Sequence, residues 1–401
     1  MAANRKLTVG VIFGGRSVEH DVSIVTGHQV MDAFDENRYT VVPIYISRDG
    51  KWYTGEGLRQ LDNYKDDAIL NHETVEPVIL SPDVRHHGLI RNPLAGRFSK
   101  SEVLRLDVLF PAIHGSHGED GTLQGLCELA DIPYVGFATT GSALTNDKIL
   151  TKQILQQNDI PVVPGITIQR DDWLRDPQAI MEQIKGAFAY PVFVKPATLG
   201  SSIGVGRADS DELLKASIDV ATSFDRRVLV EQAVKGIEIN CSIMGYGEDI
   251  RISVLEQPLS WTDFLGFDDK YLRGNEGMKS ADRIIPAPIE DDVTEQIQQA
   301  SKDAFIAVDG RGICRIDYLV DSESGAFYLN EINTMPGSLA LYLWRETNMT
   351  ASEVVEYLVK LAQDAYADKR RNVYDYKTNL VDMAAGRGLK GVKGKAKGAS
   401  S

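Results

Sequence analysis

Cysteine is scarce in this chain, and the few thiols stand far apart. Cys127, Cys241 and Cys314 are the only cysteines among 401 residues, and no two have the short spacing of a metal-binding pair. So sparse a set excludes a disulfide framework and a zinc–thiolate site. We interpret all three as buried thiols of a protein in the reducing cytoplasm.

Long hydrophobic runs and an excess of positive charge are also missing. No apolar run approaches the ~18 residues of a membrane span, so no membrane-spanning helix is expected. Residues 1–6 lead into the apolar segment 7–13 without the long core of a signal peptide. The net charge of −14 argues against general nucleic-acid binding. The content of 43% hydrophobic and 25% charged residues fits a soluble globular protein of two or three domains.

The N-terminal third has the pattern of an open α/β domain. A strand, a helix and a second strand are expected at 7–13, about 19–34 and 41–46, with Gly14 and Gly15 between the first two. Such a unit predicts a parallel sheet. Further along, we expect a strand, a loop, a helix and a short strand at 107–111, 113–121, 122–130 and 132–135. This domain is predicted to span residues 1–140.

Two further units and a tail follow. Helices at about 147–158, 177–187 and 210–222 alternate with strand patterns up to 232, which predicts a small α+β domain over residues 141–234. A third domain is expected over 235–368. The tail 369–401 has nine Lys and Arg against two Asp, and it lacks the apolar content to fold alone. Its role stays open between a solubilising end and a basic arm that contacts another molecule.

The most informative stretch is a predicted hairpin at 313–337. Two β-rich runs flank a glycine-bearing turn, and the runs carry Arg315, Asp317, Glu331 and Asn333. In such a hairpin Asp317 and Glu331 can face each other, and Asn333 shares the face of Glu331. Three oxygen ligands of this kind suit Mg²⁺. The alternative is an ordinary amphipathic hairpin with solvated charges.

Other polar motifs are individually weak. Lys195 ends a strand before the loop 200–204, whose glycines and serines can close over phosphate, although an ordinary turn looks the same. The segment 228–238 can read an adenine edge, with Glu238 on the ribose. Glu19 at a strand-to-helix turn is placed to accept an ammonium group, or is only an acid favoured by the helix dipole. The loops 14–21 and 114–121 both follow parallel strands, whose carboxyl ends bind ligands, so one pocket can hold both.

Taken together, these stretches resemble the D-alanine–D-alanine ligase family of the ATP-grasp superfamily. The likeness covers about residues 7–365 and depends on several segments in a fixed order. They are Gly-Gly-Arg-Ser-Val-Glu-His-Asp-Val-Ser at 14–23, His-Gly-Ser-His-Gly-Glu-Asp-Gly-Thr-Leu-Gln-Gly at 114–125, Pro-Val-Phe-Val-Lys-Pro at 191–196, Leu-Gly-Ser-Ser-Ile-Gly at 199–204, Asp-Lys-Tyr at 269–271, Arg-Ile-Asp at 315–317 and Asn-Glu-Ile-Asn-Thr-Met-Pro-Gly at 330–337.

The resemblance implies a three-domain ATP-grasp fold, α/β and α+β, with an N-terminal open parallel-sheet domain. ATP would lie between the central and C-terminal domains. ATP would phosphorylate the carboxylate of one D-alanine, and the amine of a second would attack the acyl phosphate to give the dipeptide for peptidoglycan synthesis. A homodimer is also expected from the resemblance.

The resemblance also assigns roles to individual residues. First-substrate and oxyanion contacts are expected from Glu19, Ser201, Tyr271, His114, Arg315 and the backbone of Gly337. Nucleotide contacts are expected from Lys148, Lys195, Ser202, Glu231, Gln232, Val234, Glu238 and, on a closing lid at 260–282, Lys270. Two Mg²⁺ or Mn²⁺ ions would be bound by Asp317, Glu331 and Asn333.

The chain departs from the family's pattern just after Gly337. The family commonly has a serine there that grips the second substrate's carboxylate, and its position falls at Tyr342 in this chain. Either Ser338 or the hydroxyl of Tyr342 is expected to substitute. The acceptor is therefore open between D-alanine and another molecule such as D-serine, D-lactate or a different amino acid, and Tyr271 favours an amide product. A non-catalytic nucleotide-binding regulator is a less favoured alternative, because the charged set is intact.

Overall fold

The computed structural model describes residues 5–94, 101–259, 283–374, 378 and 380–387. Its first part is a seven-stranded sheet in the order β6-β5-β4-β3-β2-β1-β7. The strands are β1 (Leu7–Gly14), β2 (Tyr39–Ile46), β3 (Trp52–Thr54), β4 (Glu76–Leu80), β5 (Gly88–Arg91), β6 (Glu102–Arg105) and β7 (Val108–Pro111). Only β2, β1 and β7 are parallel, and the other pairs are antiparallel. The open sheet is thus mixed rather than parallel throughout.

Helices cover this sheet and lead out of it. They are α1 (His20–Ala33), the 3-10 helices η1 (Glu56–Arg59) and η2 (Leu61–Asn71), α2 (Thr122–Ala130) and α3 (Thr139–Asn146). The prediction of a strand at 132–135 is wrong. Only one bridge forms there, between Leu109 and Tyr134, because Pro133 interrupts the segment and lacks the N–H that a ladder needs.

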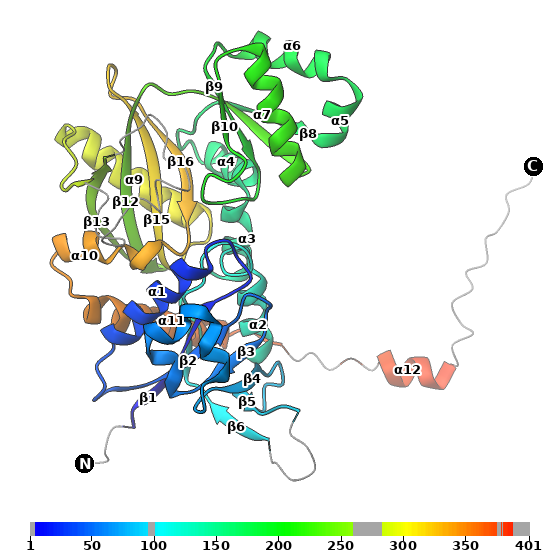
Figure 1. Ribbon diagram of the computed structural model, residues 1–401, viewed down its shortest axis with the longest axis vertical. Coiled ribbons are helices and arrows are strands. Elements are labelled where there is room, and N and C mark those ends of the chain that lie inside the picture. The colour runs from blue at the N-terminus through cyan, green and yellow to red at the C-terminus, as the bar shows by residue number, and fades with distance from the viewer. Residues whose placement is uncertain (1–4, 95–100, 260–282, 375–377, 379, 388–401) are drawn as a thin grey trace, which may run out of the picture.

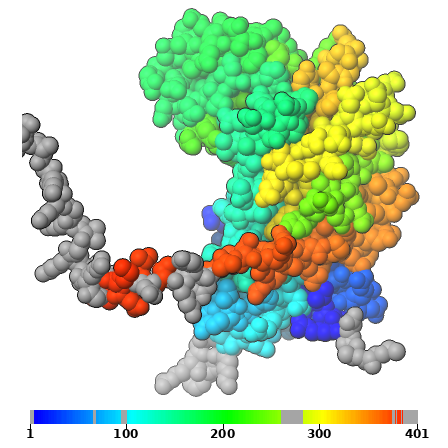
Figure 2. Space-filling model, turned by 180° about the vertical axis from the view of Figure 1, so that it is seen from behind, coloured from blue at the N-terminus to red at the C-terminus, as the bar shows by residue number. Residues whose placement is uncertain are grey.

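The central part is a four-stranded antiparallel sheet in the order β10-β9-β11-β8. Its elements are α4 (Lys148–Gln157), β8 (Gly165–Gln169), α5 (Arg170–Arg175), α6 (Pro177–Ala187), β9 (Val192–Pro196), β10 (Gly206–Ala208), α7 (Asp211–Phe224) and β11 (Arg227–Gln232). Local signals set the helix starts: the side chains of Asp147, Asp176 and Ser210 accept bonds from the first backbone N–H groups of α4, α6 and α7. Figure 2 shows this part as a green lobe that stands above the rest of the molecule.

The C-terminal part is a five-stranded antiparallel sheet in the order β14-β13-β12-β15-β16. Its elements are β12 (Gly236–Tyr246), β13 (Asp249–Pro258), β14 (Arg283–Ile284), α9 (Asp291–Ala307), β15 (Gly312–Asp321), β16 (Phe327–Asn333), η4 (Gly337–Ala340), α10 (Leu341–Glu346) and α11 (Ala351–Lys369). Side chains of α11, including Val355 and Leu358, share one buried cluster with Val9 and Phe110 of the N-terminal sheet. The chain's last long helix therefore ties the first and third parts together (Figure 1). The predicted domain boundaries stay a prediction.

The described part of the tail contains a short helix, α12 (Leu380–Arg387). Composition did not predict this helix, which lies apart from the body in Figure 1. Within the described ranges, no helix combines the length and the apolar content needed to cross a membrane.

Candidate active site

A pocket of about 230 Å³ lies where the three parts of the chain meet. The two N-terminal loops at 14–21 and 114–121 both contribute to it, which confirms that they share one pocket. The other walls come from the start of α4, the glycine–serine loop after β9 and the end of β16. The pocket is lined, among others, by Ser17, Glu19, Gly115, Glu119, Lys148, Leu199, Ser201, Glu331 and Asn333.

One end of the pocket is built around Glu19, which immediately precedes α1 and is 9% exposed. The hydroxyl of Ser201 donates a hydrogen bond to Glu19 Oε1, so the central lobe closes onto the N-terminal part at this point. Gly115 lies against the same carboxylate with φ of +74°, and a Cβ there would be 2.5 Å from Glu19 Oε2. A buried carboxylate with a hydroxyl beside it is a fitting receptor for an ammonium group.

His114 lies beneath this end of the pocket and is 3% exposed. Its Nδ1–H donates to the carbonyl of Met335 at 2.8 Å, so Nε2 accepts from the hydroxyl of Thr26 at 2.8 Å. Burial lowers the pKa of His114, which favours this neutral form. Both ring nitrogens are thus engaged within the protein, and the imidazole joins the N-terminal part to the turn before Gly337. Direct contact with the first substrate's carboxylate stays a prediction.

Glu119 also lines the pocket, and no role was predicted for it. Its Oε1 accepts from the backbone N–H of Gly115 at 2.9 Å and lies 3.9 Å from Nδ1 of His114. Burial, reinforced by the negative charge of Glu19, raises the pKa of Glu119 to about 8. The sequence does show an acidic residue in a loop after a parallel strand, but an acid in such a loop is usually solvated.

A buried cluster of three charges lies in the central part of the chain. Glu231 on β11 is 2% exposed and pairs with Lys152 of α4 and, at 2.6 Å, with Lys195 of β9. Lys195 also donates to Asn330 Oδ1 at 2.9 Å, which connects the central sheet to β16. Burial opposes ionisation of Glu231, yet the two lysines hold its pKa below the usual value. The sequence did not identify Lys152, because it lies within an ordinary amphipathic helix.

The remaining nucleotide candidates lie around this cluster. Lys148, at the start of α4, donates to the carbonyl of Leu199 at 2.7 Å. Ser202 has φ of +59° in the loop that follows. Gln232 donates to the carbonyls of the loop at 189–191, so its side chain braces that loop. Val234 and Glu238 are half-buried near the start of β12. Lys270 and Tyr271 lie outside the described residues, as does the predicted lid.

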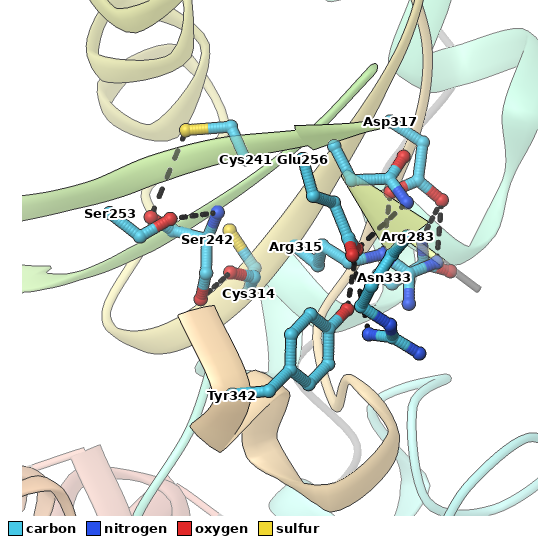
Figure 3. Close-up of polar contacts among 11 residues, drawn as sticks. Cys241, Ser242, Ser253, Glu256, Arg283, Cys314, Arg315, Asp317, Asn333 and Tyr342 are labelled. Carbon is cyan, nitrogen blue, oxygen red and sulfur yellow. Dashed lines mark hydrogen bonds and ion pairs between the residues drawn. The ribbon is translucent and has the colours of Figure 1, made fainter. Parts of the chain in front are cut away.

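The hairpin has the predicted pairing. Asp317 of β15 stands opposite Glu331 of β16, and Arg315 stands opposite Asn333. Arg315 binds both oxygens of Asp317 at 2.6 Å, and Asn333 Nδ2 donates to Oδ2 at 2.9 Å (Figure 3). Although burial opposes the charge of Arg315, Asp317 raises its pKa well above the usual value.

The fit to a metal ion follows from the chemistry of these donors. Asp317 and Glu331 offer carboxylate oxygens on facing strands, and Asn333 adds an amide oxygen, the ligand types that a hard divalent cation prefers. The hairpin offers two carboxylates and an amide, and no group of three His, Cys, Asp or Glu side chains arranged for a metal occurs anywhere in the part of the chain that the structure describes. The alternative of an amphipathic hairpin with solvated charges fails, since Asp317 is 2% exposed.

The turn after Gly337 has an unusual backbone. Ser338, Leu339 and Ala340 have φ values of +51°, +52° and +47°, a region that L residues seldom occupy in succession. Leu339 is fully buried, which holds the turn in place. The hydroxyl of Tyr342 donates to Glu256 Oε1 at 2.5 Å. Because the hydroxyl donates to Glu256, this arrangement does not favour the predicted role of Tyr342 as a hydrogen-bond donor to the second substrate.

Comparisons with known proteins agree along nearly the whole chain. A family model described as D-ala D-ala ligase N-terminus matches residues 8–137, and one described as D-ala D-ala ligase C-terminus matches 154–360. The D-alanine–D-alanine ligase of Thermosipho africanus is 37% identical over 377 residues, 94% of this chain and 99% of the relative. That of Enterococcus faecalis is 35% identical over 363 residues, 89% and 99% of the two chains.

Solved structures give the same result. The VanG D-Ala:D-Ser ligase from Enterococcus faecalis superposes with a TM-score of 0.77 at 28% identity, covering 89% of this chain and all of the other. The D-alanine-D-alanine ligase from Coxiella burnetii has a TM-score of 0.74 at 26% identity, covering 95% and 99% of the two chains.

Proposed function

The chain belongs to the D-alanine–D-alanine ligase family, and from this premise we propose that it joins two D-alanine molecules at the expense of ATP. The product, D-alanyl-D-alanine, serves peptidoglycan synthesis and hence the cell wall. One observation carries the proposal: a single pocket is lined both by Glu19 and Ser201, suited to an ammonium group, and by Glu331 and Asn333, suited to a phosphate-bound cation. A cytoplasmic homodimer is part of the same proposal.

The first step is phosphorylation of the first D-alanine. Glu19 binds its ammonium group, and Ser201 fixes the carboxylate of Glu19 through the hydrogen bond between them. A carboxylate oxygen of the substrate then attacks the γ-phosphorus of ATP, and the bond to ADP breaks. Lys195 and Lys148 supply positive charge along the phosphates, since phosphoryl transfer depends on positioning and charge neutralisation.

Three oxygen-bearing side chains of the hairpin would bind the metal ion. Asp317, Glu331 and Asn333 would hold Mg²⁺ or Mn²⁺, with two ions as the family expectation. The cation would neutralise phosphate oxygens during transfer. Arg315, which extends from β15 beside Asp317, stabilises charge on the acyl phosphate.

The second step forms the peptide bond. The amine of the second D-alanine attacks the acyl carbon, the bond to phosphate breaks, and the amine loses a proton. Arg315 and the backbone N–H of Gly337 stabilise the oxyanion of the tetrahedral intermediate. The left-handed turn from Ser338 to Ala340 fixes the direction of the chain just after Gly337.

A second candidate is a ligase of the same family with a different acceptor. The likeness to a D-Ala:D-Ser ligase and the presence of Tyr342 after the strained turn are consistent with this candidate. Phosphate release with D-alanine alone, and then with D-serine, D-lactate or other amino acids added, separates the two. No turnover with D-alanine alone would refute the leading proposal.

The metal assignment has its own test. Asp317→Asn keeps the shape of the side chain and a partner for Arg315 but removes the negative charge. We expect Mg·ATP-dependent phosphate release to fall by at least about a hundredfold, since charged groups at such centres contribute several kcal/mol. Circular dichroism should show an intact fold. Turnover within threefold of the parent would exclude Asp317 as a ligand.

A further inference from the structure

A closed loop of hydrogen bonds holds the turn that contains Gly337, whose backbone N–H is the proposed oxyanion donor. His114 donates through Nδ1 to the carbonyl of Met335 at 2.8 Å, on one side of Gly337. The hydroxyl of Thr26 donates to Nε2 of the same imidazole at 2.8 Å, and it accepts from the backbone N–H of Ser338 at 3.3 Å. Two side chains that are bonded to each other therefore hold the chain on both sides of Gly337.

The polarity of these bonds requires a hydroxyl at position 26. A carbonyl only accepts, so Nδ1 of His114 carries the proton, and Nε2 of the neutral imidazole must accept. Thr26 uses its one proton for this bond and retains lone pairs for the N–H of Ser338. A hydroxyl both donates and accepts through a single atom, which an alkyl group of the same shape cannot do.

The turn depends on such support from outside. Ser338 has φ of +51° and begins the three-residue run of left-handed backbone, which persists only where surrounding contacts hold it. Gly337 is half-buried, and a Cβ built on it would meet nothing within 4 Å, so open space adjoins this residue. Thr26, in contrast, is fully buried. The supporting side chain thus lies inside the protein, and the residue that it supports borders open space.

The helix that carries Thr26 also carries the receptor for the first substrate. Glu19 immediately precedes α1, and Thr26 lies about two turns further on, hence on the same face. Between them, the hydroxyl of Ser23 donates to the carbonyl of Glu19 at 3.0 Å and accepts from the N–H of His114 at 2.9 Å. The helix packs against η4, which begins at Gly337. One rigid element therefore sets the spacing between the ammonium receptor and the oxyanion donor.

We propose that Thr26 is a positioning residue, which together with His114 orients the N–H of Gly337 toward the oxyanion of the tetrahedral intermediate. The proposal deepens the proposed function and rests on it. Thr26 acts through the backbone and needs no contact with a substrate. Its contribution therefore belongs to the transition state, where negative charge develops, and not to binding of the ground-state substrates.

Thr26→Val tests this assignment, because valine keeps the branched shape and lacks the hydroxyl. The N–H of Ser338 and Nε2 of His114 then lose their common partner, and the turn is free to shift. Loss of an oxyanion donor costs about 10²- to 10³-fold in kcat, and a shift of ~1 Å about a hundredfold. We expect kcat to fall about 10- to 100-fold, with the KM values for ATP and the first D-alanine changed less than about threefold.

Thr26→Ser and Thr26→Cys form a matched pair that differs in one atom, oxygen or sulfur. Serine keeps the hydroxyl and should keep kcat within about threefold of the parent, whereas a thiol is a weak donor and a weak acceptor, so cysteine should fall at least about fivefold below serine. Both variants lack the same methyl group, so the packing change cancels between them. This comparison carries the test even if Thr26→Val does not fold.

The affinity for a phosphinate analogue of the tetrahedral intermediate separates positioning from a merely structural role. The tetrahedral phosphorus replaces the acyl carbon, and a phosphinate oxygen stands in for the oxyanion. A purely structural defect lowers the fraction of active enzyme and leaves the Kd of the analogue unchanged. We expect this Kd to rise about 10- to 100-fold in Thr26→Val, in parallel with the loss in kcat, while the Kd of ADP stays the same. An unchanged analogue Kd would overturn the assignment.

Thr222→Val is the matched control. Thr222 is a buried threonine of α7 whose hydroxyl donates to carbonyls of its own helix, Ile218 at 2.7 Å and Asp219 at 3.1 Å. Its kcat and analogue Kd should equal those of the parent. If the parent forms no dipeptide from D-alanine, the proposed function fails. If the parent is active and the valine and cysteine variants of Thr26 retain its kcat and analogue Kd, only the role of Thr26 fails.

Discussion

The buried charge cluster around Glu231 gives the sharpest stability prediction. The carboxylate is 2% exposed and lies between Lys152 and Lys195, whose side chains are 8% and 15% exposed. Glu231→Gln keeps the volume of the side chain and removes its charge. Two ammonium groups then stay in a poorly hydrated interior without their common counter-ion, which is an arrangement that proteins avoid.

The size of the effect follows from what remains bonded. Breaking a buried ion pair costs about 3–5 kcal/mol. After the substitution, Lys195 still donates to Asn330 and Lys152 still donates to the carbonyl of Val163 at 3.0 Å, so the low end applies. We expect a loss of about 3 kcal/mol at pH 7. With a urea slope of about 3 kcal/mol per molar, the unfolding midpoint should fall by about 1 M.

The pH dependence provides an independent check. Burial lowers the pKa of Lys152, and Glu231 opposes that effect, so the Gln variant should have a still lower folded pKa. Between that value and 10.5 the unfolded chain binds more protons than the folded chain, so stability rises with pH. The defect should therefore shrink as pH rises from 7 to 10.

The control is Glu323→Gln, which removes an exposed pair with Lys235 and should cost at most about 0.5 kcal/mol. A loss below 1 kcal/mol for Glu231→Gln at pH 7, or a defect that grows as pH rises, would contradict the reasoning.

Two further predictions concern the first-substrate end of the pocket. Gly115→Ala strains a backbone at φ of +74° and puts Cβ 2.5 Å from Glu19 Oε2. The KM for the first D-alanine should therefore rise at least about tenfold. The control Gly125→Ala, which has open space around it, should leave this KM unchanged. Burial raises the pKa of Glu119 to about 8, so folding takes up a proton between about pH 4.5 and 8, and parental stability falls as pH rises through that window. Glu119→Gln should flatten the profile of thermal midpoint against pH, and parallel profiles would exclude this role.

Much of the fold could be predicted because its signals are local. The helix expected at about 177–187 is confirmed, and Asp176 and Pro177 mark its start. The hairpin pairing was also correct, because a short turn fixes which residues face each other. The short antiparallel strands between residues 50 and 105 were harder to predict, because their sequences alternate too briefly to show a period.

The site residues also divide into those with a local signal in the sequence and those without one. The facing positions of Asp317 and Glu331, which lie within one motif, were predicted because the hairpin itself brings them together. The pairing of Lys152 with Glu231 was not predicted, because the two residues lie on different elements. Tyr342 shows the difference most clearly: its bond to Glu256 joins residues 86 positions apart, and only the fold reveals that its hydroxyl faces inward. The sequence showed that the chain departs from the family's pattern after Gly337, and the fold shows the partner that Tyr342 has there.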